Sequence, residues 1–407
     1  MRGLTNRDRS SNRARGLAAI SRRVLPAVLL TLAVTAAGCQ EAPPPGDEPA
    51  EIVGDAVLAV AFSAPLSQLG KAAEGGRIVL INGAGARRAS ITTGMDAARL
   101  AWTSNGLAFS DRLRDVVLSD RLRVEDRGSV EQEQVALLGL GNTAGDGFLA
   151  VFAGKSRGGA GRSTVTRFTA TSTRSATVPL RLEVVGRCGG QVFGIGRRVN
   201  SAGVVASRSE MARLWPGEPG KPVRLSGLAG PLPPIGAVPC PSGRLRILAT
   251  TAPGPTAAAA AAVSLVSVDT RTARATYHAL TQSGKRIMQP ADAMVWARYS
   301  SSTVRGGQLS WVSADGSAYR TTLATGATKL ARSGLPRPRA GEYRYVFQSG
   351  LAFAVGPLGN PAGVVSLSAF RLDRFTDLPK LAFPGLAALQ NPQSVIRDVA
   401  VRPGYRP

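Results

Sequence analysis

One short segment has the residue types and spacing of a hydrolase nucleophile. Gly154-Lys-Ser-Arg-Gly158 fits the G-x-S-x-G pattern, which needs a strand before the serine and a helix after it. The preceding FLAVF is strand-like, but Arg157-Gly-Gly-Ala-Gly161 is a poor start for a helix. The only histidine, His278, lies in the distant strand-like run RATYHAL, so a catalytic base would have to come from far along the chain. The segment favours a hairpin loop, and no catalytic residue is predicted.

The sequence lacks the complete motifs that usually bind cofactors and metals. A phosphate-binding P-loop needs a glycine five positions before Gly154, and Leu149 stands there. Gly139-Leu-Gly141 lacks the helix that follows a dinucleotide fingerprint. One histidine and few cysteines exclude the usual zinc sets, and no D-x-D-x-D calcium loop occurs. We therefore expect no cofactor and no metal, with a carboxylate-only calcium site as the open alternative.

Carboxylates and aromatic residues leave two further possibilities. Pairs of acids around a common axis could form a glycoside hydrolase site, but no pair stands out from one sequence. Asp111, Asp115 and Asp120 are interpreted as surface turns. Four aromatic residues could line a pocket, although strand aromatics more often belong to the core; they are Trp296, Trp311, Tyr343 and Tyr345.

The N-terminus has the organisation of an export signal. Residues 1–23 carry seven arginines and one acid, and the apolar run Val24 to Ala37 follows. Fourteen helical residues span about 21 Å, which is short for the roughly 30 Å hydrocarbon core of a membrane. Ser21-Arg22-Arg23-Val24-Leu25 is similar to a twin-arginine motif, so both general and twin-arginine export stay open. Residues 1–38 are predicted to be a signal peptide.

The small residues Ala36-Ala37-Gly38 directly precede Cys39, and this junction resembles the lipobox of bacterial lipoproteins. The resemblance implies that Cys39 is lipidated and becomes the first mature residue; Ala36 departs from the leucine usual in that family. Residues 39–51 are rich in proline and acid, which predicts an extended tether. The alternative is an ordinary secretory signal with a coincidental cysteine.

The remaining cysteines form an even pair. Outside the cytoplasm, an oxidising compartment favours a disulfide between Cys188 and Cys240. The alternative is two separate buried thiols.

The charge of the chain is strongly positive. The full sequence has a net charge of +24, and the chain from Cys39 onward would carry 43 basic against 25 acidic residues, a net +18. Such a charge favours anionic neighbours such as phospholipid headgroups or acidic wall polymers. Arginine outnumbers lysine 44 to 6, and the basic residues are scattered without an interleaved aromatic pattern. No nucleic-acid partner is therefore expected.

A recurring phrase organises the chain beyond residue 50. It has an apolar residue or cysteine, a small polar turn, a glycine and then alternating apolar positions, as in WTSNGLAF and FQSGLAF. The pattern predicts that each glycine supplies a positive φ in a tight turn and that the following strand has one buried face. The glycines, spaced by 41, 43, 53, 64 and 43 residues, are Gly106, Gly147, Gly190, Gly243, Gly307 and Gly350. The widest interval contains the helix-prone run Ala257–Ala262, interpreted as a hairpin insertion.

Units of this size hold about four strands, which is the size of a β-propeller blade. Strand-like runs occur at Arg77–Asn82, Arg87–Thr92, Val263–Val268 and Val364–Phe370. The last run, Ser394–Val401, precedes a seventh glycine, Gly404, and no strand follows it. We expect this run to complete the first blade with the strand Ala56–Phe62 and its neighbours. The prediction is an all-β, seven-bladed β-propeller over residues 52–407, with six or eight blades, or a pair of β-sandwiches, as alternatives.

These features together resemble a bacterial β-propeller lipoprotein. Asp315–Gly326 is similar to the hairpins of quinoprotein-like or YVTN-type repeats, but the tryptophan-docking signature does not recur, so no quinone is implied. The resemblance implies a lipid-anchored protein on the extracytoplasmic face of the cell membrane. Its propeller would bind a ligand or scaffold a partner, either an envelope protein or an anionic wall polymer. The alternatives are a carboxylate-based glycosidase or lyase, and an accessory lipoprotein of a membrane sensor or envelope-assembly machine.

Overall fold

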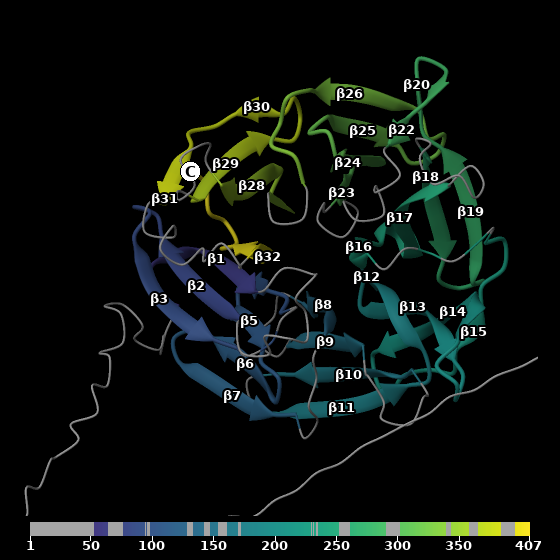
Figure 1. Ribbon diagram of the computed structural model, residues 1–407, viewed down its shortest axis with the longest axis horizontal. Helices are drawn as coiled ribbons and strands as arrows, with labels where there is room; N and C mark the ends of the chain where they lie inside the picture. Colours follow the sequence, from purple (N-terminus) through teal and green to yellow (C-terminus); the bar gives the residue numbers. More distant parts are fainter. Residues whose placement is uncertain are drawn as a thin grey trace, which may run out of the picture. The chain divides into compact units, whose positions relative to one another are not determined.

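A computed structural model places the strands of the chain in sheets arranged around one axis (Figure 1). Within the described part of the chain there is no helix long and apolar enough to cross a membrane. The structure describes residues 53–63, 76–93, 95, 98–127, 133–141, 147–153, 161–169, 172–228, 230, 232, 235–251, 261–289, 302–338, 343–357, 365–383 and 395–407. The predicted signal peptide, Cys39, the predicted tether and the Gly154–Gly158 segment lie outside these residues.

Seven antiparallel blades follow one another along the chain, each numbered here from its innermost strand outward. Blade 1 contains β32 (Val395–Val401), β1 (Ala56–Ser63), β2 (Arg77–Asn82) and β3 (Arg87–Thr92). Blade 2 contains β4 (Ala101–Thr103), β5 (Gly106–Ser110), β6 (Arg114–Leu118) and β7 (Leu122–Asp126). Blade 3 contains β8 (Gln134–Gly139), β9 (Phe148–Ala153), β10 (Ser163–Phe168) and β11 (Thr173–Val178). Blade 4 contains β12 (Arg181–Cys188), β13 (Gln191–Val199), β14 (Val205–Trp215) and β15 (Val223–Arg224).

The remaining three blades carry short additional strands. The sheet of blade 5 contains β17 (Arg244–Thr251), β18 (Ala261–Asp269), β19 (Arg274–Ala279) and the short β22 (Met288–Gln289), which pairs with β18. β20 (Thr281–Gln282) and β21 (Lys285–Arg286) form a separate hairpin. β16 (Gly236–Pro239) precedes β17 in the place of an innermost strand, but it is hydrogen-bonded to β12 in the sheet of blade 4. Blade 6 contains β23 (Ser302–Arg305), β24 (Gln308–Val312), β25 (Ala318–Thr322) and β26 (Thr328–Arg332). Blade 7 contains β27 (Arg344–Gln348), β28 (Leu351–Pro357), β29 (Val365–Arg371), β30 (Thr376–Asp377) and β31 (Leu381–Phe383).

The two ends of the propeller share a blade. β32 pairs antiparallel with β1 in a register that runs from Leu58 opposite Val401 to Ser63 opposite Val395, with one irregularity between Ala61 and Phe62. Figure 1 shows the yellow β32 beside the purple β1. The prediction that the last strand completes the first blade is confirmed, and so is the count of seven blades. The strand hydrogen bonds of β1 that would otherwise face solvent are paired.

Seven separate apolar cores lie between the blades, one for each neighbouring pair. Blades 1 and 2 share one core, and the cores continue pair by pair to blades 6 and 7. The seventh lies between blade 7 and blade 1, where Phe353 and Leu367 meet Leu58 and Ile396. An open arc of seven blades would have six such cores, so the seventh is the packing counterpart of the β1–β32 pairing.

The second strands of the blades, such as β1, β5 and β9, are buried on both faces, which corrects the expectation of one buried face. Outermost strands such as β7 and β11 are partly exposed. On β1 the larger residues Leu58, Val60 and Phe62 pack against blade 7, whereas Ala59 and Ala61 pack against blade 2. On this strand, the alternation in the sequence is therefore an alternation of large and small apolar side chains. Stacking of sheets on both sides explains it, because each blade has a neighbour on either face.

Six of the recurring glycines lie at the turn between the innermost and the second strand of a blade, here called the A–B turn. The seventh, Gly404, follows β32, the innermost strand of blade 1. Five have the expected positive φ: Gly106 (+121°), Gly243 (+72°), Gly307 (+73°), Gly350 (+79°) and Gly404 (+81°). The expectation is wrong for the other two. In blade 4 the positive φ belongs to Gly189 rather than Gly190. In blade 3 a Cβ on Gly147 would lie 2.1 Å from the carbonyl oxygen of Phe168, so close packing excludes a side chain there.

Blade 5 departs from the regular plan. Its innermost strand, β16, pairs in parallel with β12 of blade 4, from Val184 opposite Gly236 to Arg187 opposite Pro239. Cys188 and Cys240 are the next residues on the two strands, and they form the predicted disulfide, with a Cα–Cα distance of 4.9 Å. The bond closes a loop with a sequence separation of 52, which corresponds to a stabilisation of about 4 kcal/mol in the chain-entropy model. It joins the A–B turns of neighbouring blades.

The widest interval between the recurring glycines, from Gly243 to Gly307, contains two additions to the regular blade. Ala261 and Ala262, the end of the alanine run, begin β18 and pair with β22. The residues between β17 and Ala261 lie outside the described part of the chain. The short β20–β21 hairpin and β22 add further length after β19.

Ring closure gives a stability prediction. Ile396 is fully buried in the core between blades 7 and 1. The change Ile396→Ala should lower the free energy of unfolding by about 2–5 kcal/mol, because it opens a cavity at the closing strand. Val124→Ala is the control, since Val124 is 41% exposed on the outermost strand of blade 2, and it should change stability by about 0.5 kcal/mol or less. Urea denaturation measures both. Equal effects would contradict a packed closing strand.

Candidate functional site

One face of the propeller carries the A–B turns and the turns between the third and fourth strands. In an antiparallel blade these two turns lie at the same end, and the parallel pairing of β12 with β16 shows that the innermost strands of blades 4 and 5 run in the same direction. This end is called the A–B face. The turns on it bond to each other within blades: Thr270 N donates to Gly243 O (3.0 Å) and Leu372 N to Gly350 O (2.9 Å).

A pocket of about 490 Å³ opens on the A–B face between blades 1 and 2. The A–B turn of blade 2 contributes Trp102 and Ser104, its second turn contributes Asp120, and the closing turn after β32 contributes Arg402. Arg402 Nη1 donates to the carbonyl oxygens of Gly54 (2.8 Å) and Ala56 (3.3 Å), so the ring closure also fixes this wall.

The carboxyl group of Asp120, which lines this pocket, is ionised at neutral pH. Ser119 Oγ donates a 2.7 Å hydrogen bond to Asp120 Oδ1, and this bond is the main cause that lowers the pKa of Asp120. Gly106 allows the close approach of two turns, because a Cβ there would lie 2.6 Å from Leu118 O. The pocket thus offers an indole, a carboxylate and a guanidinium on rigid turns, which suits recognition of a polar ligand or a peptide.

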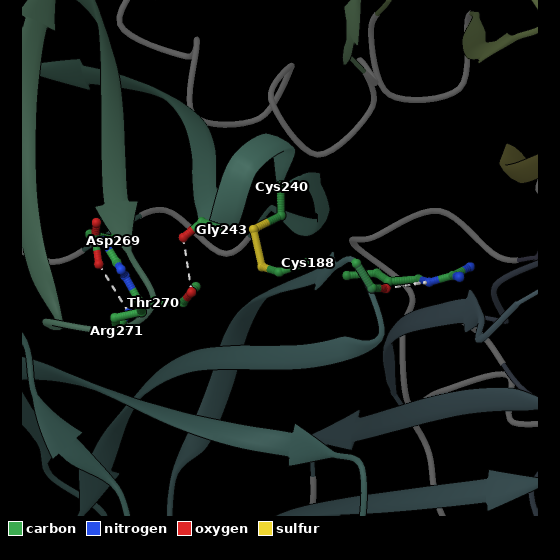
Figure 2. Close-up of a disulfide and its surroundings, with 8 residues drawn as sticks. Cys188, Cys240, Gly243, Asp269, Thr270 and Arg271 are labelled. Atoms are coloured by element: carbon green, nitrogen blue, oxygen red, sulfur yellow. Dashed lines mark hydrogen bonds between the residues drawn. A yellow bond between two sulfur atoms is a disulfide. The ribbon is translucent and has the colours of Figure 1, made fainter.

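A second pocket, of about 540 Å³, lies on the same face at blade 5. It is lined by the A–B turn, by the first residues of β17 and by the turn after β18: Ser242, Gly243, Arg244, Arg246, Asp269 and Arg271. The disulfide holds the same A–B turn, as Figure 2 shows. Three arginines and one aspartate make this pocket electropositive.

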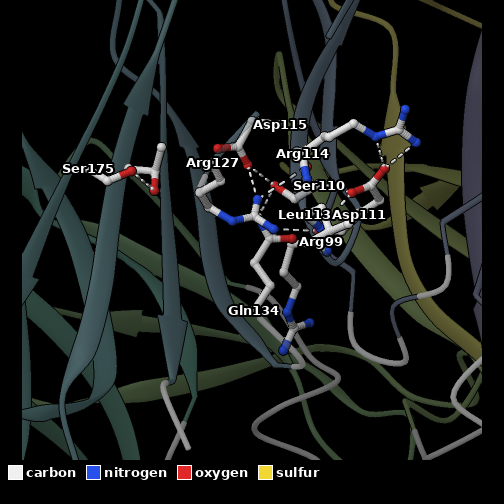
Figure 3. Close-up of polar contacts among 10 residues, drawn as sticks. Arg99, Ser110, Asp111, Leu113, Arg114, Asp115, Arg127, Gln134 and Ser175 are labelled. Carbon is white, nitrogen blue, oxygen red and sulfur yellow. Dashed lines mark hydrogen bonds and ion pairs between the residues drawn. The ribbon is translucent and has the colours of Figure 1, made fainter. Parts of the chain in front are cut away.

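A buried polar network lies at the opposite end of blade 2 (Figure 3). Arg127 Nη1 donates to Asp115 Oδ1 (2.5 Å), and both side chains of this ion pair are fully buried. Ser110 Oγ also donates to Asp115 Oδ1 (2.7 Å), and Gln134 Nε2 donates to Ser110 Oγ (3.1 Å). These bonds join blade 2 to the innermost strand of blade 3.

The Arg127 guanidinium also closes the hairpin between β5 and β6. Its Nη2 donates to Asp111 O (2.6 Å), and its Cζ lies 4.2 Å from the ring centroid of Phe152 in blade 3. Burial is the largest influence on Asp115 and raises the pKa of its carboxyl, although Arg127 and Ser110 act against this. The carboxylates of this network form ion pairs with arginines of the same blade, so we interpret the network as stabilising the fold.

The structure corrects one interpretation of the acids. Asp111 (8% exposed) and Asp115 (1% exposed) are buried, and they are not surface turns as expected. Asp120 does lie at an exposed turn. Since both faces of a blade are covered, a polar residue on a strand can be enclosed while its neighbours in the sequence are exposed.

Among the described residues, the candidate aromatic residues and the histidine singled out in the sequence do not line the two pockets. Trp311 is fully buried, stacks on Tyr319 at 4.7 Å and donates Nε1 to Thr321 Oγ1 (3.0 Å). Tyr345 is buried and donates its hydroxyl to Pro336 O (2.6 Å). His278 lies on β19, the outer strand of blade 5. Trp296 lies outside the described residues.

Sequence reasoning missed the residues that line the two pockets. Trp102 and Ser242, which line them, both belong to the recurring phrase and lie shortly before the turn glycine. That position is a usable signal, because the A–B turns of blades 2 to 7 lie on one face. Arg246 gave no signal, since in RLRI it reads as the exposed residue of an alternating strand.

The Arg127–Asp115 pair predicts a pH-dependent defect. Arg127→Met should lower the free energy of unfolding by about 3–5 kcal/mol at neutral pH, because an uncompensated carboxylate stays buried. The pKa of Asp115 would rise further above its usual 3.8, so the folded variant binds a proton that the unfolded chain does not. Its deficit relative to the wild type should therefore grow as the pH rises from about 4 towards 7.

Arg114→Met is the matched control within the same network. Arg114 pairs with Asp111 at 2.7 Å, but its side chain is 51% exposed, so its loss should cost about 1 kcal/mol or less. Urea denaturation at several pH values measures both variants. An Arg127→Met deficit that does not change with pH would show that Asp115 is not its source.

Comparisons with known proteins give distant likenesses among solved structures. Neither protein-family models nor curated protein sequences match this chain. Among solved structures it is similar to apo AztD from Citrobacter koseri, with a TM-score of 0.45, 10% identity and coverage of 84% of this chain and 98% of that one. It is also similar to BamB from Moraxella catarrhalis, with a TM-score of 0.37, 13% identity and coverage of 83% and 86%. A chimera of ACO and RPE65 gives a TM-score of 0.46 at 10% identity, over 82% and 90% of the two chains. At these values no function passes from them to this chain.

Proposed function

We propose that this protein is a lipid-anchored extracytoplasmic binding protein whose propeller engages an anionic ligand or partner through the A–B face. The observation that carries the proposal is that two pockets, at blades 1–2 and at blade 5, both open on this face. Each is built from turns that hydrogen bonds or a disulfide hold in place. Rigid turns on a scaffold are where binding sites of propeller-like folds belong.

The charge of the chain supports an anionic partner on the outer side of the membrane. A net +18 from Cys39 onward attracts acidic wall polymers, phospholipid headgroups or an acidic envelope protein. The export signal and the small residues before Cys39 support the anchor. Residues 39–51 would then tether the propeller to the membrane surface.

Binding is favoured over catalysis by the state of the carboxylates. Asp111 and Asp115 are bound to arginines, and Asp120 accepts a bond from its neighbour Ser119. Among the described residues, no three histidine, cysteine or acidic side chains come together as metal ligands would. No specific observation favours the glycosidase or the sensor-accessory alternative.

The anchor is tested at Cys39. Mass spectrometry of the N-terminal peptide of the mature protein should show a diacylglyceryl group on the Cys39 sulfur, and the protein should fractionate with membranes. Cys39→Ser should lose this modification, and the exported protein should leave the membrane fraction, because two or more acyl chains are needed for firm attachment. An exported mature protein with an unmodified Cys39 would refute the anchor.

Binding through the A–B face is tested by site-specific photo-crosslinking in intact cells. The exposed residues Ser104 and Ser242, on the two pocket rims, are each replaced by a photoreactive phenylalanine; Arg174, exposed on the outer strand β11, is the control. Cross-links to one envelope component should form from the rim positions and not from Arg174. Cross-linking to that component from Arg174 alone would place the binding surface elsewhere.

A further inference from the structure

Arg246 is a buried cation without a buried counter-charge. It lies on β17, is 9% exposed and faces Ser267 across the sheet. Its Nη1 donates to Ser267 Oγ, whereas its Nε is buried with no hydrogen-bond partner. No acidic side chain in the described part of the chain forms an ion pair with it. Arg127, by contrast, is buried against Asp115.

The electrostatics of Arg246 reflect this isolation. Burial, and after it the like charge of Arg244, lowers the pKa of the Arg246 guanidinium. A charged group in such a position normally requires a partner, because desolvation of an unpaired ion is costly. Arg246 lines the blade 5 pocket, so an anion entering this pocket would supply the missing charge.

Two further arginines border the same pocket. Arg244 lies 3.5 Å from Asp269 Oδ2, with its side chain 53% exposed, and this ion pair is weak at such a distance and exposure. Asp269 Oδ1 instead accepts the backbone amides of Arg271 (3.0 Å) and Thr272 (3.1 Å). The bond from Thr272 is the main cause that lowers the pKa of Asp269. The pocket thus has three guanidinium groups and one carboxylate that its own turn already uses.

The walls of the pocket are fixed before any ligand arrives. Thr270 donates both its backbone N (3.0 Å) and its Oγ1 (2.9 Å) to Gly243 O, which ties the two turns of blade 5 together. The disulfide from Cys240 to Cys188 holds the A–B turn against blade 4. Figure 2 shows the disulfide beside these two turns. A site whose parts are already in place loses little entropy on binding.

We infer that the blade 5 pocket binds a phosphate group, held by Arg246 at its base and by Arg244 and Arg271 at its rim. Three arginines and one aspartate leave a formal charge of +2, which matches the charge of about −1.5 to −2 on a phosphate monoester. Guanidinium groups suit this ligand because their planar donors match phosphate oxygens. The inference rests on the proposed function, since it names the ligand class for one of the two pockets of the A–B face.

The direct test is a titration of the full propeller with inorganic phosphate, followed by ³¹P NMR at neutral pH and constant ionic strength. The wild type should show saturable binding. Arg246→Gln should weaken it about tenfold or more, the size expected for loss of a charge-assisted hydrogen bond. Arg224→Gln is the matched control, because it removes the same charge from an exposed position on β15, away from the pocket. It should bind as the wild type does.

A second variant covers the case in which Arg246→Gln does not fold. Arg244→Gln with Arg271→Gln changes only exposed side chains, so it should keep the fold and still weaken phosphate binding. Absence of saturable binding in the wild type, or equal binding by wild type and the double variant, would overturn the inference.

Vesicle binding separates the sources of the phosphate group. Vesicles of phosphatidylglycerol in phosphatidylcholine, with free phosphate as competitor, should bind the wild type more than the double variant if a lipid headgroup occupies the pocket. Binding of free phosphate without this difference assigns the pocket to a soluble or polymer-borne phosphate. The failure of the phosphate site would leave the cross-links from Ser104 intact, whereas failure of the proposed function would abolish cross-linking at both rims.

Discussion

The closure of the ring is the constraint on which the rest of the structure depends. Every blade is apolar on both faces, so each face requires a neighbouring blade. A linear stack would leave two such faces in water and one strand edge unpaired. Pairing of β32 with β1 covers these two faces and the strand edge, because it completes blade 1 and creates the seventh core against blade 7. The hydrophobic gain of that core therefore depends on residues more than 300 positions apart.

Closure also organises the candidate binding face. All the A–B turns reach the same face only because the innermost strands run in one direction around the axis. The pocket between blades 1 and 2 exists where the closing turn, with Arg402, meets the turns of blade 2. The blade 5 pocket depends on a different device. There the innermost strand β16 pairs with blade 4, and the disulfide fixes its turn beside β17.

Two buried arginines show how the same residue type takes different roles in this ring. Arg127 is paired with Asp115, donates to the backbone of its own hairpin and lies over Phe152, so its charge serves cohesion between blades 2 and 3. Arg246 has a hydroxyl partner and, among the described residues, no carboxylate in an ion pair with it. A buried charge without compensation costs stability, and such a cost at a pocket is typical of a site that keeps a group available for a ligand.

The sequence by itself determined the modular part of this protein. The strand bounds follow from local alternation and turn residues, so Arg77–Asn82 and Arg87–Thr92 were predicted as they occur. The repeated glycine phrase predicted the A–B turns of blades 2 to 7, and the strand-like run Ser394–Val401 predicted the closing strand. The two cysteines that remain beside Cys39 predicted the pair Cys188–Cys240. These features are local or counted along the chain, and so one sequence carries them.

Only the tertiary structure decided which polar residues are enclosed and which face the pockets. RLRI around Arg246 reads as a half-exposed strand, and Asp115 was interpreted as part of a surface turn, although it lies buried on β6. A local pattern does not show which neighbouring blade covers a strand. The parallel pairing of β16 with β12 likewise has no local signal, since it depends on where the blade 4 strand ends. The modules follow from short-range pattern, whereas burial of charge and the shape of the pockets arise from contacts between blades that are distant in sequence.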